Sequence, residues 1–330
     1  MENNLLKFSH SPHVKTARTT KGIMIDVLIA LLPTAIVGCV YFGWMAVLML
    51  ALSVISAIGA EFVYLLITGK TFREILDQFD YTSAVTGLLV GMTISTVYPW
   101  YAPILGSIFA IIVVKMLFGG TGKNVANPAI VGRIFIFMSF QAMIVGDWLL
   151  PSIAPISSKA VSTGATALTS MLESGKVPTL SLLDLFLGTG LAGCIGETCK
   201  LSLILGGIYL VIRGVIKWYY PLLYIVTTGL VSVALYNSFA FFLPSILTGG
   251  LILGAIFMAT DYVTSPNTTL GNVIYFVGLG VITAVLRYAT NMEVVSFAIL
   301  LMNLLVPLID KFVITKPFGF VRNKKSKEKN

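Results

Sequence analysis

Long apolar runs cover most of the chain and define the elements that we expect. A helix that crosses a bilayer needs about 20 predominantly apolar residues, and runs of that kind recur before and after one polar interval, residues 143–182. The pattern predicts an all-α polytopic membrane protein with about ten transmembrane helices. The expected helices lie near residues 23–42, 44–67, 81–98, 101–118, 125–142, 196–213, 221–242, 246–262, 270–286 and 294–312.

One apolar stretch does not fit a full span. Residues 182–195 (LLDLFLGTGLAGCI) are short and rich in glycine, so we expect a half-helix or re-entrant segment there, at the outer face. Five spans on each side of the polar interval suit two five-helix halves of opposite orientation. The expected organisation is an N-terminal tail (1–22), a first five-helix half (23–142), an outer loop with the half-helix (143–195), a second five-helix half (196–313) and a basic C-terminal tail (314–330).

Composition and charge support this topology. Hydrophobic residues make up 57% of the chain and charged residues 11%, with a mean hydropathy of +0.92. So few charges cannot cover a soluble surface. The net charge of +8 lies mainly in the two tails rather than on a folded face, which argues against nucleic-acid binding. By the positive-inside rule both termini are expected in the cytoplasm and the interval 143–182 outside. The cations before the first apolar run are Lys7, Lys15, Arg18 and Lys21, and those at or after the end of the last run are Lys311, Lys316, Arg322, Lys324, Lys325, Lys327 and Lys329.

Two clusters of glycine, proline and asparagine interrupt the membrane pattern at predicted cytoplasmic ends. They are FGGTGKNVANPAIVGR (118–133) and MATDYVTSPNTTLGN (258–272). Non-helical backbone at membrane depth is tolerated where it packs against protein or lines a cavity, so a polar site near the inner face is one interpretation. Ordinary turn chemistry is the other. The residues concerned are Asn124, Asn127, Asp261, Thr264 and Asn267.

A few ionisable residues lie within or beside apolar runs. Such a group costs at least ~2.5 kcal/mol on insertion scales, so it normally faces a partner or a water path. An ion route through Glu61, Glu197 and Asp261 is one hypothesis. The alternative is an ion pair between helices or a side chain that reaches the interface, which we favour for Asp26 and Lys115.

Motifs of self-contained catalysis are missing from the sequence. We find no G-x-S-x-G, H-E-x-x-H or phosphate-binding loop. His10 and His13 lie together in the N-terminal tail. Cys39, Cys194 and Cys199 form neither a C-x-x-C pair nor a disulfide framework, and we expect buried, inert thiols.

The polar interval contains KAVSTGATALTSM (159–171), a hydroxyl-rich stretch without a histidine or an acid beside it. Together with SPHVKTARTT, GKNVANPAIVGR, GETCKLS and MATDYVTSPNTT, in this order along the chain, it resembles a known family. That family comprises the D subunit of the Rnf complex and the B subunit of the sodium-pumping NADH:quinone reductase. The resemblance covers essentially the whole chain, and the short N-terminal tail fits the Rnf subunit better.

The resemblance implies a covalent flavin. In the family, the last threonine of S/T-G-A-T carries FMN as a phosphoester, and the matching residue here is Thr166, after Thr163, Gly164 and Ala165. A separate flavin transferase performs the attachment, so the hydroxyl needs no local base. The family often has an acid six positions before this threonine, where this chain has Ala160. A Ser/Thr linker is the alternative interpretation of the same residues.

The resemblance also implies a function. Rnf complexes in bacterial or archaeal plasma membranes carry electrons from ferredoxin to NAD and export sodium or protons. This chain would relay electrons among the other subunits without a complete active site of its own. A second, non-covalent flavin (riboflavin) is expected near Asn124–Asn127 and Asp261–Pro266, the same segments that are candidates for the ion route. The alternatives are a flavin-free small-solute transporter and a non-redox assembly subunit.

Overall fold

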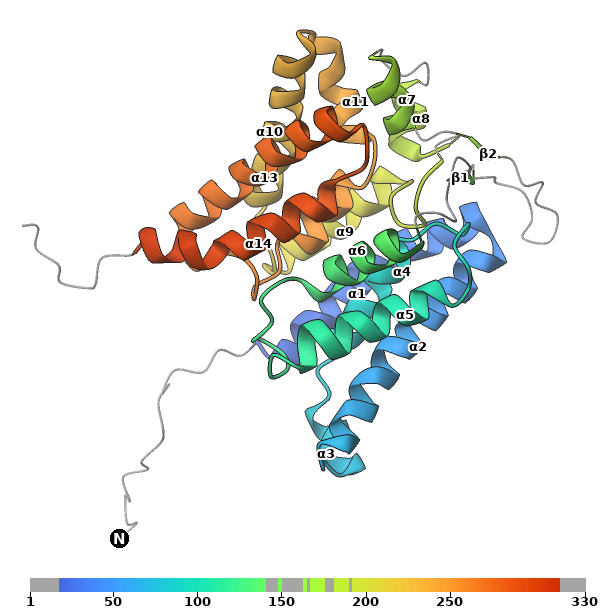
Figure 1. Ribbon diagram of the computed structural model, residues 1–330, viewed down its shortest axis with the longest axis vertical. Coiled ribbons are helices and arrows are strands. Elements are labelled where there is room, and N and C mark those ends of the chain that lie inside the picture. The colour runs from blue at the N-terminus through green and yellow to red at the C-terminus, as the bar shows by residue number, and fades with distance from the viewer. Residues whose placement is uncertain are drawn as a thin grey trace, which may run out of the picture.

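A computed structural model describes residues 18–140, 148–149, 163–164, 167–175, 181–189 and 192–314 (Figure 1). His10, His13, Ala160, Ala165 and Thr166 lie outside these residues. The elements are α1 (Thr20–Phe42), α2 (Trp44–Ile67), α3 (Phe72–Gln78), α4 (Thr82–Met92), α5 (Ala102–Phe109), η1 (Ala110–Met116), α6 (Pro128–Phe140), β1 (Trp148–Leu149), β2 (Thr163–Gly164), α7 (Ala167–Ser174), α8 (Leu182–Leu187), α9 (Lys200–Ile212), α10 (Tyr219–Tyr236), η3 (Phe239–Phe241), α11 (Phe242–Leu247), α12 (Leu251–Leu253), η4 (Gly254–Met258), α13 (Thr269–Thr290) and α14 (Val295–Phe312).

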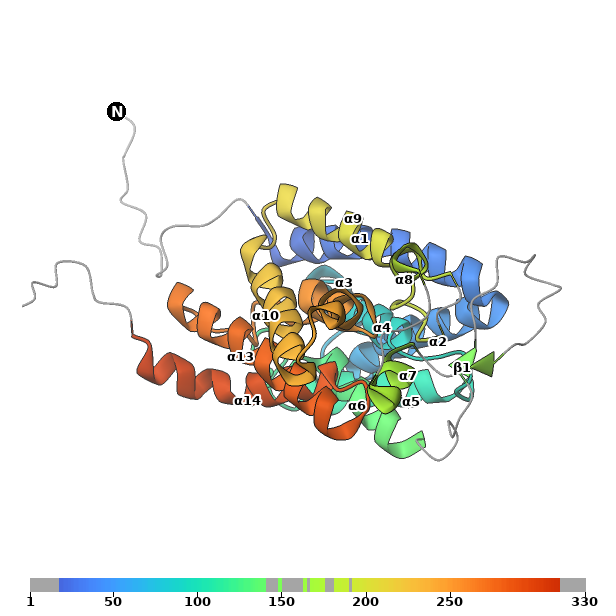
Figure 2. The same cartoon turned by 90° about the horizontal axis from the view of Figure 1, so that it is seen from above.

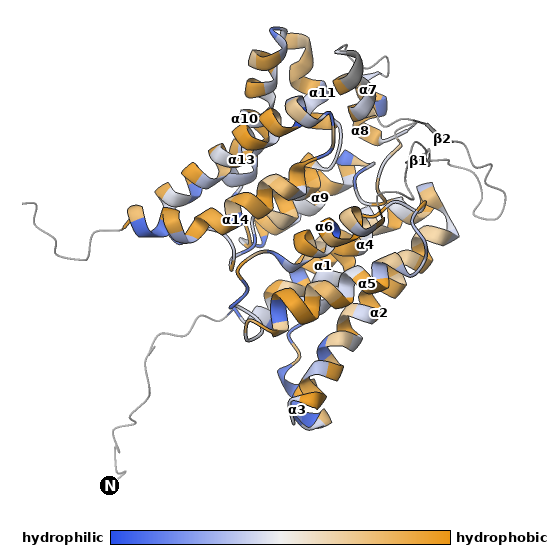
Figure 3. Ribbon diagram, in the orientation of Figure 1, coloured by the Kyte–Doolittle hydropathy of each residue, from blue (hydrophilic) through white to orange (hydrophobic). Residues whose placement is uncertain are grey.

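The long helices are apolar over most of their surface, and two of them, α1 and α13, begin with a side-chain cap. The Thr19 hydroxyl accepts from Gly22 N–H at the start of α1, and Thr268 caps α13 through Gly271 N–H in the same way. α13 ends at Thr290 and is followed by Asn291, whose positive φ of 54° suits an asparagine. Figure 3 shows hydrophobic residues around the helices, with polar residues gathered in α3 and in connecting loops. Helices of this kind are stable only inside a membrane or a large core.

The expected all-helical membrane fold is confirmed. In the described part of the chain, five helices (α1, α2, α10, α13 and α14) are long and apolar enough to cross a membrane. A sixth candidate is the pair from Phe239 to Met258, which bends by 68° between Leu247 and Leu251. Four shorter apolar helices, Thr82–Met92, Ala102–Met116, Pro128–Phe140 and Lys200–Ile212, have 10–17 residues. Each expected run thus contains a helical segment, while the count of ten complete crossings stays a prediction.

The N-terminal and C-terminal sets of helices contact each other closely. α9 packs along α1, and α14 packs against α6. Figures 1 and 2 show both contacts, with α1 and α9 on one face of the bundle and α6 and α14 on the other. At Gly206 of α9, an added Cβ would lie 2.2 Å from the carbonyl oxygen of Ala30 in α1. The two backbones can therefore meet only because residue 206 has no side chain. The opposite orientation of two halves stays a prediction.

Gly206→Ala is expected to lower the thermal stability of the purified protein in detergent. Backbone cannot withdraw as a flexible side chain can, so the overpacking should cost about 1–3 kcal/mol. Gly59→Ala is the matched control, because a Cβ there meets nothing within 4 Å and Gly59 also lies within a long helix. If Gly206→Ala has the same melting temperature as Gly59→Ala, the described contact between α1 and α9 is contradicted.

Of the residues expected to form a half-helix, 182–187 are a short helix and 192–195 have irregular backbone; a re-entrant segment at the outer face stays a prediction. α8 has six residues and ends at Gly188, where φ is 82°. Farther along, Ile195 N–H donates to the carbonyl of Ile94 (3.1 Å) and Gly196 N–H to that of Met92 (2.7 Å). The segment therefore packs into the break that follows α4, which satisfies its polar backbone.

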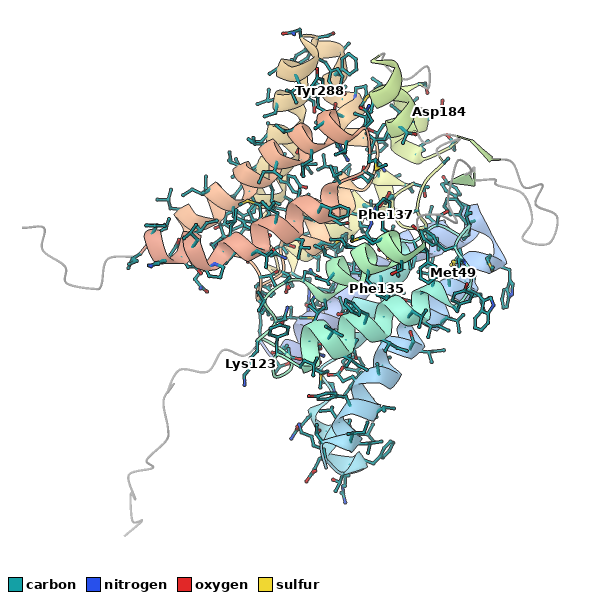
Figure 4. All side chains as sticks on the ribbon, in the orientation of Figure 1. Met49, Lys123, Phe135, Phe137, Asp184 and Tyr288 are labelled. Carbon is teal, nitrogen blue, oxygen red and sulfur yellow. The ribbon has the colours of Figure 1, made fainter. Side chains whose placement is uncertain are left out.

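The two ends of the bundle differ. In Figures 1 and 2 the start of α1 and the end of α14 lie at one end, whereas β1, β2, α7 and α8 lie at the other. Figure 4 places Lys123, in the loop after η1, and Asp184, on α8, at these opposite ends. The first helix therefore begins, and the last helix ends, at the same end of the bundle. Which end faces the cytoplasm stays a prediction.

Candidate functional site

A cavity of about 290 Å³ lies at the end of the bundle that carries α7, and we call it the α7 cavity. Its walls come from the break after α4, from α6, α7 and α14, and from the irregular segment before α9. Phe137 of α6, labelled in Figure 4, and Phe297 of α14 line it. The two rings meet edge to face, with centroids 6.0 Å apart. The volume is at the lower end of the range of small-molecule sites, roughly 300–1,000 Å³.

Helix α7 connects this cavity to the hydroxyl-rich motif. Leu168 and Met171 are buried and form an apolar cluster with Phe241, from the C-terminal set of helices. This packing holds the first turn of α7, including Ala167, at the cavity wall. Before α7, Thr163–Gly164 forms β2 and pairs antiparallel with β1. Although Thr166 itself lies outside the described residues, the cavity wall begins at the next residue along the chain.

Five charged side chains lie beside this cavity and form what we call the charge cluster. Arg133 Nη2 lies 3.0 Å from Glu197 Oε1, and Arg287 Nη2 lies 2.9 Å from Glu293 Oε2. Lys200 Nζ donates to the backbone carbonyls of Glu197 and Gly249, the latter at 3.0 Å. Lys200 and Arg287 are only 2% and 3% exposed. Ionised groups so deeply buried must be paired or hydrogen-bonded, and all five are.

Two glycines make room for the cluster at the 68° bend between α11 and α12. At Gly249, φ is +66° and a Cβ would lie 1.8 Å from Glu293 Oε2. At Gly250, a Cβ would lie 2.5 Å from Glu197 Oε1. The helix breaks where the carboxylates need the space, and the freed carbonyl of Gly249 accepts from Lys200.

Sequence reasoning found only part of this site. Glu197 was singled out, but Arg133, Lys200, Arg287 and Glu293 were not. The signal that could have found Arg133 and Arg287 is the one used for Glu61, an ionisable residue inside an apolar run.

The two interrupted segments meet at the opposite end of the bundle, and a polar functional site there stays a prediction. Asn124, Asn127 and Asp261 line one cavity of about 110 Å³, which we call the tail-end cavity. Asn127 accepts from Ala129 N–H (3.0 Å) at the start of α6 and donates to the Met258 carbonyl (3.1 Å) at the end of η4. One side chain therefore joins both breaks.

The remaining polar residues of these segments have other partners. Thr264 is buried and donates to Asp261 (3.2 Å), whereas Asn267 donates to Asp310 through its backbone (3.1 Å) and side chain (2.8 Å). Asn303 of α14, which sequence reasoning missed, is 1% exposed. With its amide nitrogen toward the Thr264 carbonyl, it accepts from Asn127 N–H at 3.2 Å.

A buried ion pair leads into the tail-end cavity. Lys115, on the π-helix η1, lines the cavity and lies 2.7 Å from Glu61 Oε1, with side-chain exposures of 3% and 9%. Lys115 also donates to Thr82 Oγ1, and both Thr82 and Thr121 donate to Asp80. Burial opposes ionisation of Asp80, but these hydrogen bonds and the Lys115 charge outweigh it, so the pKa of Asp80 lies below its ordinary value.

The three acids expected to form an ion route do not share one cavity. Glu197 lines the α7 cavity, Asp261 lines the tail-end cavity, and Glu61 reaches the latter through Lys115. Asp26 forms the expected ion pair between helices, 3.1 Å from Arg213 Nε. Cys39, Cys194 and Cys199 are free thiols. Among the described residues no group of three His, Cys, Asp or Glu could hold a metal ion.

Comparison with known proteins gives matches over nearly the whole chain. The model of the NQR2, RnfD, RnfE family matches residues 7–319. The chain is 37% identical to the D subunit of the Na(+)-translocating ferredoxin:NAD(+) oxidoreductase complex of Acetobacterium woodii, over 97% of both chains. It is 35% identical to the D subunit of the ion-translocating oxidoreductase complex of Stutzerimonas stutzeri, over 92% of this chain and 93% of the relative. It is 34% identical to the D subunit of the proton-translocating ferredoxin:NAD(+) oxidoreductase complex of Clostridium ljungdahlii, over 97% and 98%.

Proposed function

The chain belongs to the NQR2, RnfD, RnfE family, and from this premise we propose that it is the flavin-bearing membrane subunit of an ion-translocating ferredoxin:NAD oxidoreductase. It would work with the other subunits of an Rnf complex and exchange electrons with them. The names of its relatives support the complex. The observation that carries the flavin role is the α7 cavity, whose wall begins one residue after Thr166.

The residues of the α7 cavity fit a flavin ring. Most of the lining is apolar, with a few polar groups, as is usual for cofactor sites. Ser296 lines the cavity and is 4% exposed, and its Oγ has no hydrogen-bond partner in the described part of the chain. A Cβ at Gly193 would meet only one atom within 4 Å, so this wall leaves space for a ligand. A buried polar atom without a partner beside open space points to a bound group.

Each part of the site has a role in this proposal. Thr166, with Thr163, Gly164 and Ala165, would carry FMN as a phosphoester, after modification by a flavin transferase. The first N–H groups of α7 follow this residue directly, and a helix N-terminus favours a phosphate. Phe137 and Phe297 would exclude water from the ring. When bound, FMN would supply the redox chemistry, while the protein fixes its place and electrostatics.

The tail-end cavity is our candidate for the second flavin and the ion route. Asn124 and Asn127 offer amide groups that suit a riboflavin ring. The volume of about 110 Å³ is below the size of ordinary ligand sites, so side chains such as Phe257 must move before a ring can enter. We derive no electron step through this site. Asp261 offers a carboxylate to a cation, and the relatives' names include both sodium and proton as the transported ion.

The test uses inverted membrane vesicles from cells that make the complete complex, with and without this chain. We expect ferredoxin-dependent NAD reduction and the accompanying ion uptake to disappear without the chain and to return when it is supplied again. Supplying Gly59→Ala should restore both equally, as a control for expression of an altered chain. Uptake is measured separately for sodium and, with a pH-sensitive dye, for protons. Unchanged NAD reduction with loss of one solute's uptake would favour the transporter alternative. Loss of the whole complex from the membrane would favour the assembly role.

A further inference from the structure

The charge cluster beside the α7 cavity contains more cations than anions. Among the residues that the structure describes, Arg133, Lys200 and Arg287 face two carboxylates, those of Glu197 and Glu293. The formal charge of the cluster is therefore positive. An excess charge in a low-dielectric interior is costly unless an anion or an electron-rich group compensates it.

Arg133 is the cation of the cluster that lines the cavity, whereas neither Lys200 nor Arg287 does. Lys200 is held by two backbone carbonyls, and Arg287 by Glu293 and by the carbonyls of Ser245 and Thr248. Arg133 has one ion pair in the described part of the chain, through Nη2, and its side chain lines the cavity with 13% exposure. A guanidinium carries five N–H donors in a fixed plane. Several of them can therefore reach a group inside the cavity.

We propose that Arg133 faces the flavin ring in the α7 cavity and raises its reduction potential, with Glu197 limiting the effect. This inference rests on the proposed function, because it needs a flavin joined to Thr166. Charge near the nitrogens of a flavin ring tunes its redox behaviour. A positive charge stabilises the reduced ring, which becomes anionic when two electrons arrive with one proton. Arg133 is thus a positioning and tuning residue with a measurable electrochemical signature.

Opposite shifts are expected from the two partners of the ion pair. Arg133→Gln removes the cation and leaves the Glu197 carboxylate, so the reduced ring is destabilised and the midpoint potential falls. Glu197→Gln leaves Arg133 without its counter-charge, so the potential rises. We expect at least a tenfold change in the equilibrium between oxidised and reduced ring in each case, about 30 mV for a two-electron couple. The double variant has the net charge of the wild type and should lie between the two.

The experiment is a spectroelectrochemical titration of the full-length chain, produced with a flavin transferase and purified in detergent. Dithionite supplies two electrons and is oxidised to sulfite, and one proton comes from the buffer. A parallel titration of Thr166→Ala gives the contribution of any non-covalent flavin, which is subtracted. Arg213→Gln is the matched control, because this arginine pairs with Asp26 and lines neither cavity. Its potential should equal that of the wild type.

The outcomes separate this inference from the proposed function. A wild-type chain without covalent flavin contradicts the proposed function itself. A normal covalent flavin whose potential is unchanged in both cavity variants, or shifts in the same direction in both, overturns the role of Arg133. If Arg133→Gln does not fold, Arg133→Lys keeps the charge with fewer donors. Its potential should then lie close to that of the wild type, and a fall of tenfold or more in the equilibrium would also overturn the charge argument.

Discussion

Replacing Thr166 with alanine is expected to remove all covalent flavin from the protein. The phosphoester needs a side-chain oxygen, which alanine lacks, so the effect should be complete rather than partial. The measurement is fluorescence under ultraviolet light after denaturing electrophoresis, which retains only covalently bound flavin. Wild type should give a fluorescent band and Thr166→Ala a dark band of equal protein content.

Neighbouring hydroxyls provide the matched controls for this experiment. Thr163→Ser keeps a hydroxyl at the first position of the S/T-G-A-T motif, and Thr169→Ala removes one from α7 at the cavity wall. Both should keep the fluorescent band. If either goes dark while Thr166→Ala stays fluorescent, the attachment site is wrong.

The residue at position 160 adds a second test. The family often has an acid there, whereas this chain has Ala160. We expect Ala160→Asp to be labelled to the same extent as the wild type. A dark wild type in the presence of the transferase, with a fluorescent Ala160→Asp, would show that the missing acid prevents recognition. A dark band in both would contradict flavin attachment and favour the transporter or assembly alternatives.

The sequence predicts the helical segments well because each apolar run in lipid must form a helix whatever its neighbours are. Backbone groups in lipid have to be satisfied within the segment, so local composition is sufficient. The sequence also places Asn124, Asn127 and Asp261 at one end, because both interrupted segments follow spans that end on the same side. The predicted order of spans is therefore sufficient to bring the two segments to the same end of the bundle, although they are far apart in the sequence.

The charge cluster could not be predicted in this way. Its members come from α6, α9, α13 and the segments beside them, and the sequence does not say which faces of these helices meet. The need for glycine at the bend was equally hidden, because the side chains that a Cβ would meet there, Glu293 and Glu197, come from elsewhere in the chain. The α7 cavity depends on the packing of Leu168 and Met171 against Phe241, a contact between distant segments.

Lys115→Met is expected to destabilise the protein strongly, whereas the double variant Lys115→Met, Glu61→Met is expected to be nearly as stable as the wild type. The single change leaves a carboxylate with 9% side-chain exposure without its cation, and Oε2 of Glu61 already lacks a hydrogen-bond partner in the described residues. Breaking a buried pair costs about 3–5 kcal/mol, but replacing both partners with apolar residues is often neutral. Thermal unfolding in detergent measures all three variants. Asp26→Asn is the control, because its partner Arg213 is 55% exposed and the substitution therefore leaves no buried charge without a partner.

The same double variant tests whether Glu61 belongs to the ion route. If two apolar residues can replace a buried ion pair at no cost in stability, the pair is not needed to hold the fold together. An ionisable pair at membrane depth then points to a function. The pair also reaches the tail-end cavity, where Asp261 lies. We therefore expect vesicles with the double variant to keep a folded, flavin-bearing protein but to lose ion uptake. If uptake instead continues at the wild-type rate, the pair only joins two helices, and the ion route must pass through Asp261 by another path.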